Sequence, residues 1–156
     1  MTSVAVSNVT VMTTPTASLT LTNNFVYTED PEASLGFYRD VLGMTVKTGV
    51  TNGDFRWLTV STPTQPELEV TISPIGPGAL PASEADLDAM RDLLAKGLLG
   101  ALIFTVDDVD ALFEHVRASG AEVLQEPADQ FYGVRDCAFR DPAGNMCRFN
   151  TPLQQG

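Results

Sequence analysis

The sequence is short of several residue types on which common activities depend. It has one histidine (His115), two cysteines (Cys137 and Cys147), and 9 lysines and arginines against 20 acidic residues, a net charge of −11. Binding to a phosphate backbone or an anionic membrane surface depends on lysine and arginine, so this balance argues against nucleic-acid and membrane partners. The two cysteines match no zinc-binding spacing and no disulfide framework, which favours reduced thiols in a cytoplasmic protein.

Long apolar runs and a basic N-terminal segment are also missing. No stretch of about 18 apolar residues occurs, so no transmembrane helix is expected. The first 28 residues carry no charged side chain, which is unlike the basic start of a secretory signal. We expect residues 1–20 to form an N-terminal arm or an accessory strand. The 156 residues fit a single domain that needs neither a metal nor a disulfide to fold.

A βαβββ pattern extends over residues 21–74. Residues 24–28 have strand propensity, Asp30 and Pro31 are typical of a helix start, and Gly43 is typical of a helix end. Apolar and β-branched residues then indicate three further strands, around Val46, over residues 55–61 and over residues 68–73.

The same order of elements returns over residues 99–152. Asp108 is placed to begin a helix that ends at Gly120, and the sequence Asp-Pro-Ala-Gly starting at Asp141 predicts a turn between the last two strands. Two copies of one pattern indicate an internal duplication. The remaining segments are a linker with a helix over residues 83–95, together residues 75–98, and a tail, residues 153–156.

Residues around the first helix of each copy carry a resemblance to a known family. Residues 30–44 resemble the first-helix signature of the vicinal oxygen chelate superfamily, which includes glyoxalase, bleomycin-resistance protein and extradiol dioxygenases. Residues 106–111, 132–135 and 139–145 resemble its second copy, so the resemblance covers about residues 21–152. It implies an α+β fold in which two tandem βαβββ modules form a cup of curled sheets, and it implies a homodimer.

The resemblance also implies where a metal would bind. Enzymes of this superfamily hold a divalent metal in the cup through a His on the first strand and a Glu on the last strand of each copy. The matching positions hold Asn23 and Ala101 on the first strands, and Glu69 and Arg148 on the last. Alanine and a guanidinium cannot coordinate a metal, and one carboxylate with an amide is too little for a transition metal. We therefore expect no metal or other cofactor, with a divalent metal as the alternative.

Opposite charges at the two carboxylate positions suggest that Glu69 and Arg148 form an ion pair across the cup. Glu69 is also the one candidate catalytic residue, although a neighbouring arginine would hold it ionised and hence weakly basic. Strand alternation, and the position of one loop beside the cup, select the candidate ligand contacts. These are Asn23, Phe25, Trp57, Glu69, Ile103, Tyr132, Arg135 and Arg148.

The departures at the metal positions favour metal-free binding of a small molecule, as in the drug-sequestering members of the superfamily. The acidic charge suits a cationic ligand. The alternative is a glyoxalase- or dioxygenase-type lyase, isomerase or oxygenase, and a third possibility is a dimeric interaction module with an empty cup. The sequence leaves open whether both modules share one cup within a chain or swap across a dimer.

Overall fold

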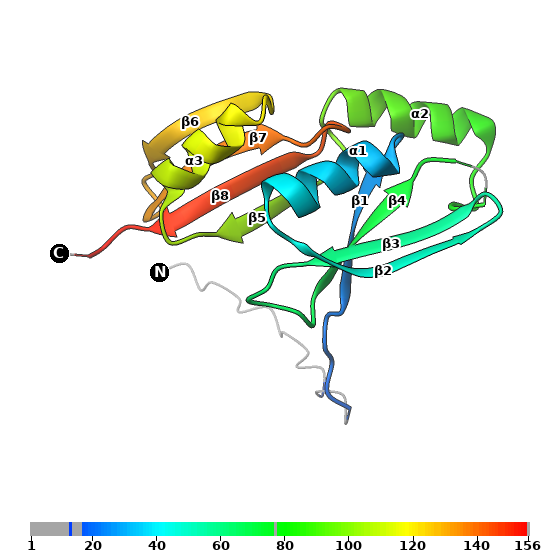
Figure 1. Ribbon diagram of the computed structural model, residues 1–156, viewed down its shortest axis with the longest axis horizontal. Coiled ribbons are helices and arrows are strands. Elements are labelled where there is room, and N and C mark those ends of the chain that lie inside the picture. The colour runs from blue at the N-terminus through cyan, green and yellow to red at the C-terminus, as the bar shows by residue number, and fades with distance from the viewer. Residues whose placement is uncertain (1–12, 14–16, 77, 156) are drawn as a thin grey trace, which may run out of the picture.

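The computed structural model describes residues 13, 17–76 and 78–155, and most of the predicted arm, residues 1–20, lies outside this part of the chain. The first half contains β1 (Asn23–Thr28), α1 (Pro31–Leu35), η1 (Gly36–Val41), β2 (Thr45–Asn52), β3 (Phe55–Ser61) and β4 (Glu69–Pro74). After α2 (Glu84–Ala95) come β5 (Ala101–Thr105), α3 (Val109–Ala118), β6 (Val123–Asp129), β7 (Val134–Arg140) and β8 (Met146–Pro152), as Figure 1 shows.

The strands form two four-stranded sheets of the same topology. Sheet A has the order β1-β4-β3-β2 and sheet B the order β5-β8-β7-β6. In each sheet the first strand of the module runs parallel to the last, and the other neighbours are antiparallel. The predicted α+β fold of two βαβββ modules is confirmed, and neither sheet closes into a barrel. Among the described residues, no helix is long and apolar enough to cross a membrane.

The helices begin where the sequence predicts. The side chains of Asp30, Ser83 and Asp108 each accept a hydrogen bond from the backbone N–H three residues later, at 3.0–3.2 Å. Glycines with positive φ, Gly43 and Gly120, follow the helices of the two modules. One difference is that the first helix continues beyond Leu35 with wider π-helical turns.

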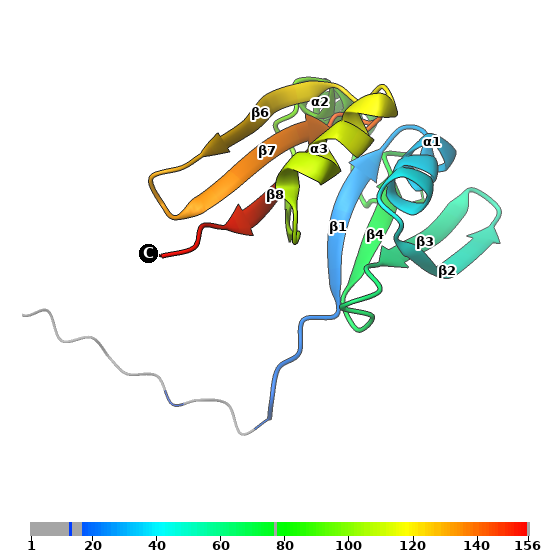
Figure 2. The same ribbon diagram turned by 60° about the vertical axis from the view of Figure 1, so that its left-hand side comes forward.

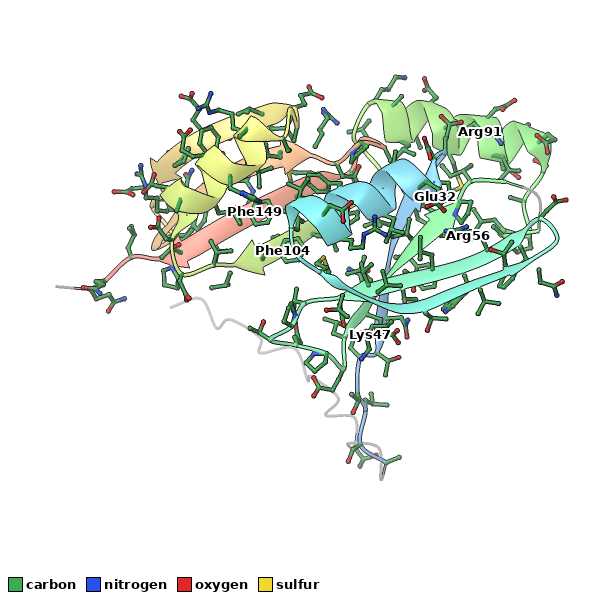
Figure 3. The ribbon with its side chains drawn as sticks, viewed as in Figure 1. Glu32, Lys47, Arg56, Arg91, Phe104 and Phe149 are labelled. Atoms are coloured by element: carbon green, nitrogen blue, oxygen red, sulfur yellow. The ribbon has the colours of Figure 1, made fainter. Side chains whose placement is uncertain are left out.

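Helix α1 and the strands of each module are held together by specific side-chain pairs (Figure 3). Arg56 of β3 forms an ion pair with Glu32 of α1, which connects this helix to sheet A at the surface. The rings of Phe104 on β5 and Phe149 on β8 stack at 5.2 Å with an interplanar angle of 13°. Both pairs lie on the sides of the sheets that carry the helices.

The two modules share one hydrophobic core. It combines α1, η1 and α3 with the helix-bearing faces of both sheets, and in Figure 2 α1 lies over sheet A and α3 over sheet B, at the boundary between the sheets. The buried residues of α2, Leu87 and Leu94, form a separate cluster with Ile75. Val70 of β4 and Leu102 of β5 line the same cavity of about 160 Å³. His115 of α3 lies 2.8 Å from the Val41 carbonyl at the end of η1. The helix-bearing faces of the two sheets therefore converge.

The opposite faces of the sheets point away from this core. Because side chains alternate along a strand, burial of Val70 and Ile72 puts Glu69 and Thr71 on the other side of sheet A. We call this side open face A; it carries Asn23, Phe25, Tyr27, Phe55, Trp57, Thr59, Glu69, Thr71 and Ser73. Open face B, the corresponding side of sheet B, carries Ala101, Ile103, Gln125, Asp136, Ala138 and Arg148. Within one chain the two open faces do not form a common cup.

A buried carboxylate in the turn between β7 and β8 connects the modules. One oxygen of Asp141 accepts hydrogen bonds from three successive backbone N–H groups, residues 143–145, at 2.9–3.0 Å. The other accepts from the Tyr38 hydroxyl at 2.6 Å and from Asn145 Nδ2 at 2.9 Å. Asn145 Nδ2 also donates to the Tyr27 carbonyl of β1. Burial raises the pKa of Tyr38 well above its ordinary value, and nearby Cys147 and Asp141 raise it further, so the phenol remains a donor.

Replacing Tyr38 with phenylalanine tests this connection. A hydrogen bond to a charged group contributes about 1.5–3 kcal/mol. We expect Tyr38→Phe to lower the thermal midpoint by roughly 4–8 °C, measured by circular dichroism. Lys96→Gln, which removes an exposed ion pair with Asp92, is the control and is expected to leave the midpoint nearly unchanged. Equal midpoints for the two variants would show that the Tyr38–Asp141 bond does not hold the modules together.

Candidate functional site

Open face A contains a cavity of about 280 Å³ with aromatic walls. The aromatic walls come from Phe25 and Tyr27 of β1 and from Phe55 and Trp57 of β3, and Arg56, Ala79 and Leu80 complete the lining with Thr71 and Ser73 of β4. The Phe25 and Trp57 rings meet edge to face, with centroids 6.0 Å apart. Such an arrangement leaves ring faces and edges available to a flat ligand. We call this cavity the aromatic pocket.

Hydroxyl groups of β4 lie at the polar side of the aromatic pocket. Thr71 pairs with Phe25 and Ser73 with Tyr27 across the parallel strands, so both hydroxyls share the face of the aromatic rings. Thr71 Oγ1 accepts a hydrogen bond from Asn23 Nδ2 at 3.3 Å. Ser73 is 8% exposed and contributes to the lining of the aromatic pocket, where its hydroxyl is the polar group beside Tyr27.

Glu69 lies at the end of open face A, opposite Asn23 in the register of β4 and β1. Its side chain is half-buried, and Oε1 accepts a hydrogen bond from Thr59 Oγ1 at 2.6 Å. Two of the four predicted cup positions, Asn23 and Glu69, are therefore neighbours. The other two are on sheet B.

Open face B is organised around a second buried carboxylate, Asp136, whose side chain is 1% exposed. Gln125 and Gln130 donate to one oxygen at 2.7 and 2.9 Å, and Tyr132 and Arg148 donate to the other at 2.8 Å. Burial acts to raise the pKa of Asp136, but the four hydrogen bonds outweigh it and lower the pKa below its usual value. The hydrogen bond to Asp136 also raises the pKa of Tyr132, so the phenol stays protonated.

Arg148 is held in one orientation by this network. Its Nη1 donates to Asp136 and also to Gln125 Oε1 at 3.1 Å, and 24% of the side chain is exposed. Among the described residues, neither Nε nor Nη2 of Arg148 has a hydrogen-bond partner. Open face B thus presents a fixed guanidinium with unused N–H groups.

The ion pair hypothesised between Glu69 and Arg148 does not form within the chain. Arg148 pairs with Asp136 and Glu69 accepts from Thr59. The physical reason is the shared core: it directs the two open faces away from each other, so equivalent strand positions do not meet. Sequence reasoning missed Asp136. The signal was present, because alternation along β7 places an acidic residue on the same face as Arg148 of the neighbouring strand.

The remaining predicted contacts divide between the two sides of sheet B. Ile103 is 66% exposed on open face B, and Tyr132 is 55% exposed beside Asp136. Arg135 instead lies on the helix-bearing side, where it pairs with Asp110 of α3 at 3.0 Å and with Asp129 at 3.1 Å. A shift of one residue along a strand reverses its face. Arg135 therefore does not join Arg148.

The donors at the superfamily's metal positions do not fit a metal ion. Ala101 has no ligating atom, Arg148 is a cation already paired with Asp136, and the remaining positions, Asn23 and Glu69, supply one amide and one carboxylate. In residues 13, 17–76 and 78–155, no three His, Cys, Asp or Glu side chains are grouped so that they could hold a metal. The expected metal-free cup rests on this donor chemistry and stays a prediction.

Comparison with known proteins agrees with the fold and with the duplicated modules. A sequence model of the Glyoxalase/Bleomycin resistance protein/Dioxygenase superfamily matches residues 17–149. The chain belongs to this superfamily. The predicted resemblance is thereby confirmed at the level of the family.

Solved structures and a curated relative show the same likeness. The crystal structure of UcmS2 matches with a TM-score of 0.77 and 31% identity, over 86% of this chain and 98% of that chain. TnmS3, an antibiotic binding protein from Streptomyces sp. CB03234, matches with a TM-score of 0.66 and 24% identity, over 87% of this chain and 98% of that chain. The uncharacterized protein YurT from Bacillus subtilis (strain 168) is 26% identical over 121 residues, 78% of this chain and 90% of YurT.

The buried carboxylate of open face B generates a prediction about pH. Because the pKa of folded Asp136 lies below its unfolded value, which is about 3.9, the charge stabilises the fold above about pH 4. This contribution is lost as the pH falls through the folded pKa. We expect Asp136→Asn to lower the free energy of unfolding in urea at neutral pH, and the difference from wild type to shrink at about pH 3.

A matched variant isolates the effect of burial in that experiment. Asp88→Asn removes an exposed carboxylate that pairs with Arg91 on α2, and it is expected to change the unfolding free energy little at either pH. A difference between wild type and Asp136→Asn that stays constant from neutral to acidic pH would contradict the account of Asp136 as a buried, ionised group.

Proposed function

We propose that the protein binds a flat, largely apolar small molecule in the aromatic pocket and does not transform it. The observation that carries this proposal is the cavity of about 280 Å³ with four aromatic side chains and two hydroxyls around it. Ligand pockets are typically concave, mostly apolar and equipped with a few polar groups, and their volumes start at about 300 Å³. The aromatic pocket therefore suits a fused ring system better than a large molecule.

The chemistry of the other polar groups favours binding over catalysis. A cysteine nucleophile must ionise, yet burial raises the pKa of Cys137 to about 11 and that of Cys147 to about 12. His115 lies on α3, on the helix side of the sheets, next to the Val41 carbonyl. Because the donors at the superfamily's metal positions do not fit a metal, and the described residues hold no other such group, we favour binding over the glyoxalase- and dioxygenase-type alternatives.

TnmS3 supports a more specific form of the proposal. That protein is an antibiotic binding protein and shares the fold of this chain, and the superfamily includes bleomycin resistance proteins. We carry this to the present chain as drug or antibiotic sequestration without a metal. The buried, free thiols of Cys137 and Cys147 support the cytoplasmic location expected from the sequence.

We also propose a homodimer in which open face A of one chain meets open face B of its partner. Both open faces carry exposed apolar side chains, among them Phe25 at 43% and Ile103 at 66%. Strands β1 and β5 are edge strands of their sheets, and exposed apolar edges favour association. In this arrangement the partner's open face B covers the aromatic pocket, and the cup predicted from the sequence forms between chains.

A change of one exposed residue tests the dimer. Ile103→Glu places a charge at the proposed interface, so we expect the protein to change from dimer to monomer in light scattering after gel filtration. Leu98→Glu alters an equally exposed leucine, 68% accessible, before β5 and should leave the mass unchanged. A wild-type protein with the mass of one chain would rule out the dimer directly.

Binding is tested with acridine, a flat neutral ring system, through the fluorescence of Trp57. Trp57 is the single tryptophan, so quenching of its emission reports ligand in the aromatic pocket. We expect saturable quenching, and a roughly tenfold weaker affinity for Phe25→Ala because one wall of the pocket is lost. Leu98→Ala is the control with unchanged affinity. Absence of quenching in the wild type would contradict the proposed function and favour an interaction module with an empty cup.

A further inference from the structure

The unused N–H groups of Arg148 point to the chemistry of the ligand. The Arg148 side chain is three-quarters buried, and within the described residues its guanidinium is engaged only through Nη1, by Asp136 and Gln125. A guanidinium offers five N–H donors in a planar fork that matches the two oxygens of a carboxylate. The N–H groups of Nε and Nη2 can therefore donate hydrogen bonds to an oxygen atom of a ligand at open face B.

The residues around Arg148 hold its guanidinium in one orientation. Asp136 is saturated by four donors. One of them, Gln125, also accepts a hydrogen bond from the guanidinium, and Tyr132 donates to the same carboxylate oxygen as Arg148. These four donors hold the Asp136 carboxylate in a fixed position. Because Arg148 Nη1 donates to both Asp136 and Gln125, the direction of its other N–H groups is fixed as well.

We propose that the ligand is a flat aromatic molecule that carries a carboxylate or another ionised oxygen at its edge, and that Arg148 of the partner subunit receives this oxygen. The inference rests on the proposed function, since the rings occupy the aromatic pocket of one chain and the oxygen reaches open face B of the other. Asp136 is a positioning residue that acts through Arg148. The site is incomplete without the second copy.

The overall charge of the protein does not decide against this ligand. The net charge of −11 repels an anion at long range, but at physiological ionic strength the screening length is about 8 Å. At contact distance the local donors dominate. The negative net charge and Glu69 on open face A favour a cationic ligand instead. The ligand titrations below therefore include a cationic ligand.

Three ligands with one ring system separate the possibilities. These are acridine, acridine-9-carboxylate and 9-aminoacridine, which at neutral to mildly basic pH are neutral, anionic and cationic. Each is titrated against the dimer with Trp57 quenching as the readout. We expect the carboxylate to bind at least about tenfold more tightly than acridine, which corresponds to one charge-assisted anchor. Binding of 9-aminoacridine in preference to the carboxylate would overturn the inference.

Variants of Arg148 and Asp136 show whether this preference comes from the guanidinium. Arg148→Met should abolish the preference, so that acridine-9-carboxylate binds no more tightly than acridine to the same variant. Arg148→Lys keeps the charge without the planar fork, so a partial preference is expected and folding is protected. Asp136→Asn should weaken binding of the carboxylate only. Arg117→Gln, on the exposed side of α3, is the control and should retain the full preference.

The outcomes distinguish this inference from the proposed function. The inference is overturned if the wild type binds acridine and its carboxylate equally, or if the preference survives in both Arg148 variants. Either result is still compatible with binding of a ligand in the aromatic pocket. Failure of all three ligands to quench Trp57 overturns both.

Discussion

The placement of the two modules depends on one buried group, the carboxylate of Asp141. It accepts hydrogen bonds from three backbone N–H groups of its own turn and from Tyr38 of the other module. A buried carboxylate without partners would be strongly unfavourable, so these donors must be present together. The turn, η1 and the end of β1 are thereby fixed relative to one another. This geometry directs the helices into the shared core and the open faces away from it.

The positions of the open faces decide what the protein can bind by itself. One chain presents an aromatic pocket on sheet A and a fixed guanidinium on sheet B, and the core separates them. Phe25 and Ile103 are partly exposed in the single chain. In the proposed dimer a second copy covers both, and the site then depends on the assembly.

Local features of the fold were predictable from the sequence because they depend on short-range interactions. The capping residues Asp30 and Asp108 act within one helical turn, and the alternation that places Phe25 and Trp57 on one face acts within a strand. The Glu69–Arg148 pair was wrong within the chain because it required the relative placement of two sheets, which the core determines. Arg135 was also placed wrongly. Its position just after a loop did not reveal on which face of β7 its side chain lies.

At one of the superfamily's metal-binding positions this chain has Arg148 in place of a carboxylate. This difference determines which steps of the superfamily's chemistry the position can support. A metal in the cup attracts an oxygen of the ligand and also polarises it as a Lewis acid. A guanidinium held by Asp136 can still attract such an oxygen, through N–H donors, but it supplies neither an open coordination position nor an activated water. Under the proposed function, Arg148 therefore performs only the first of the two roles of a metal, the attraction of a ligand oxygen.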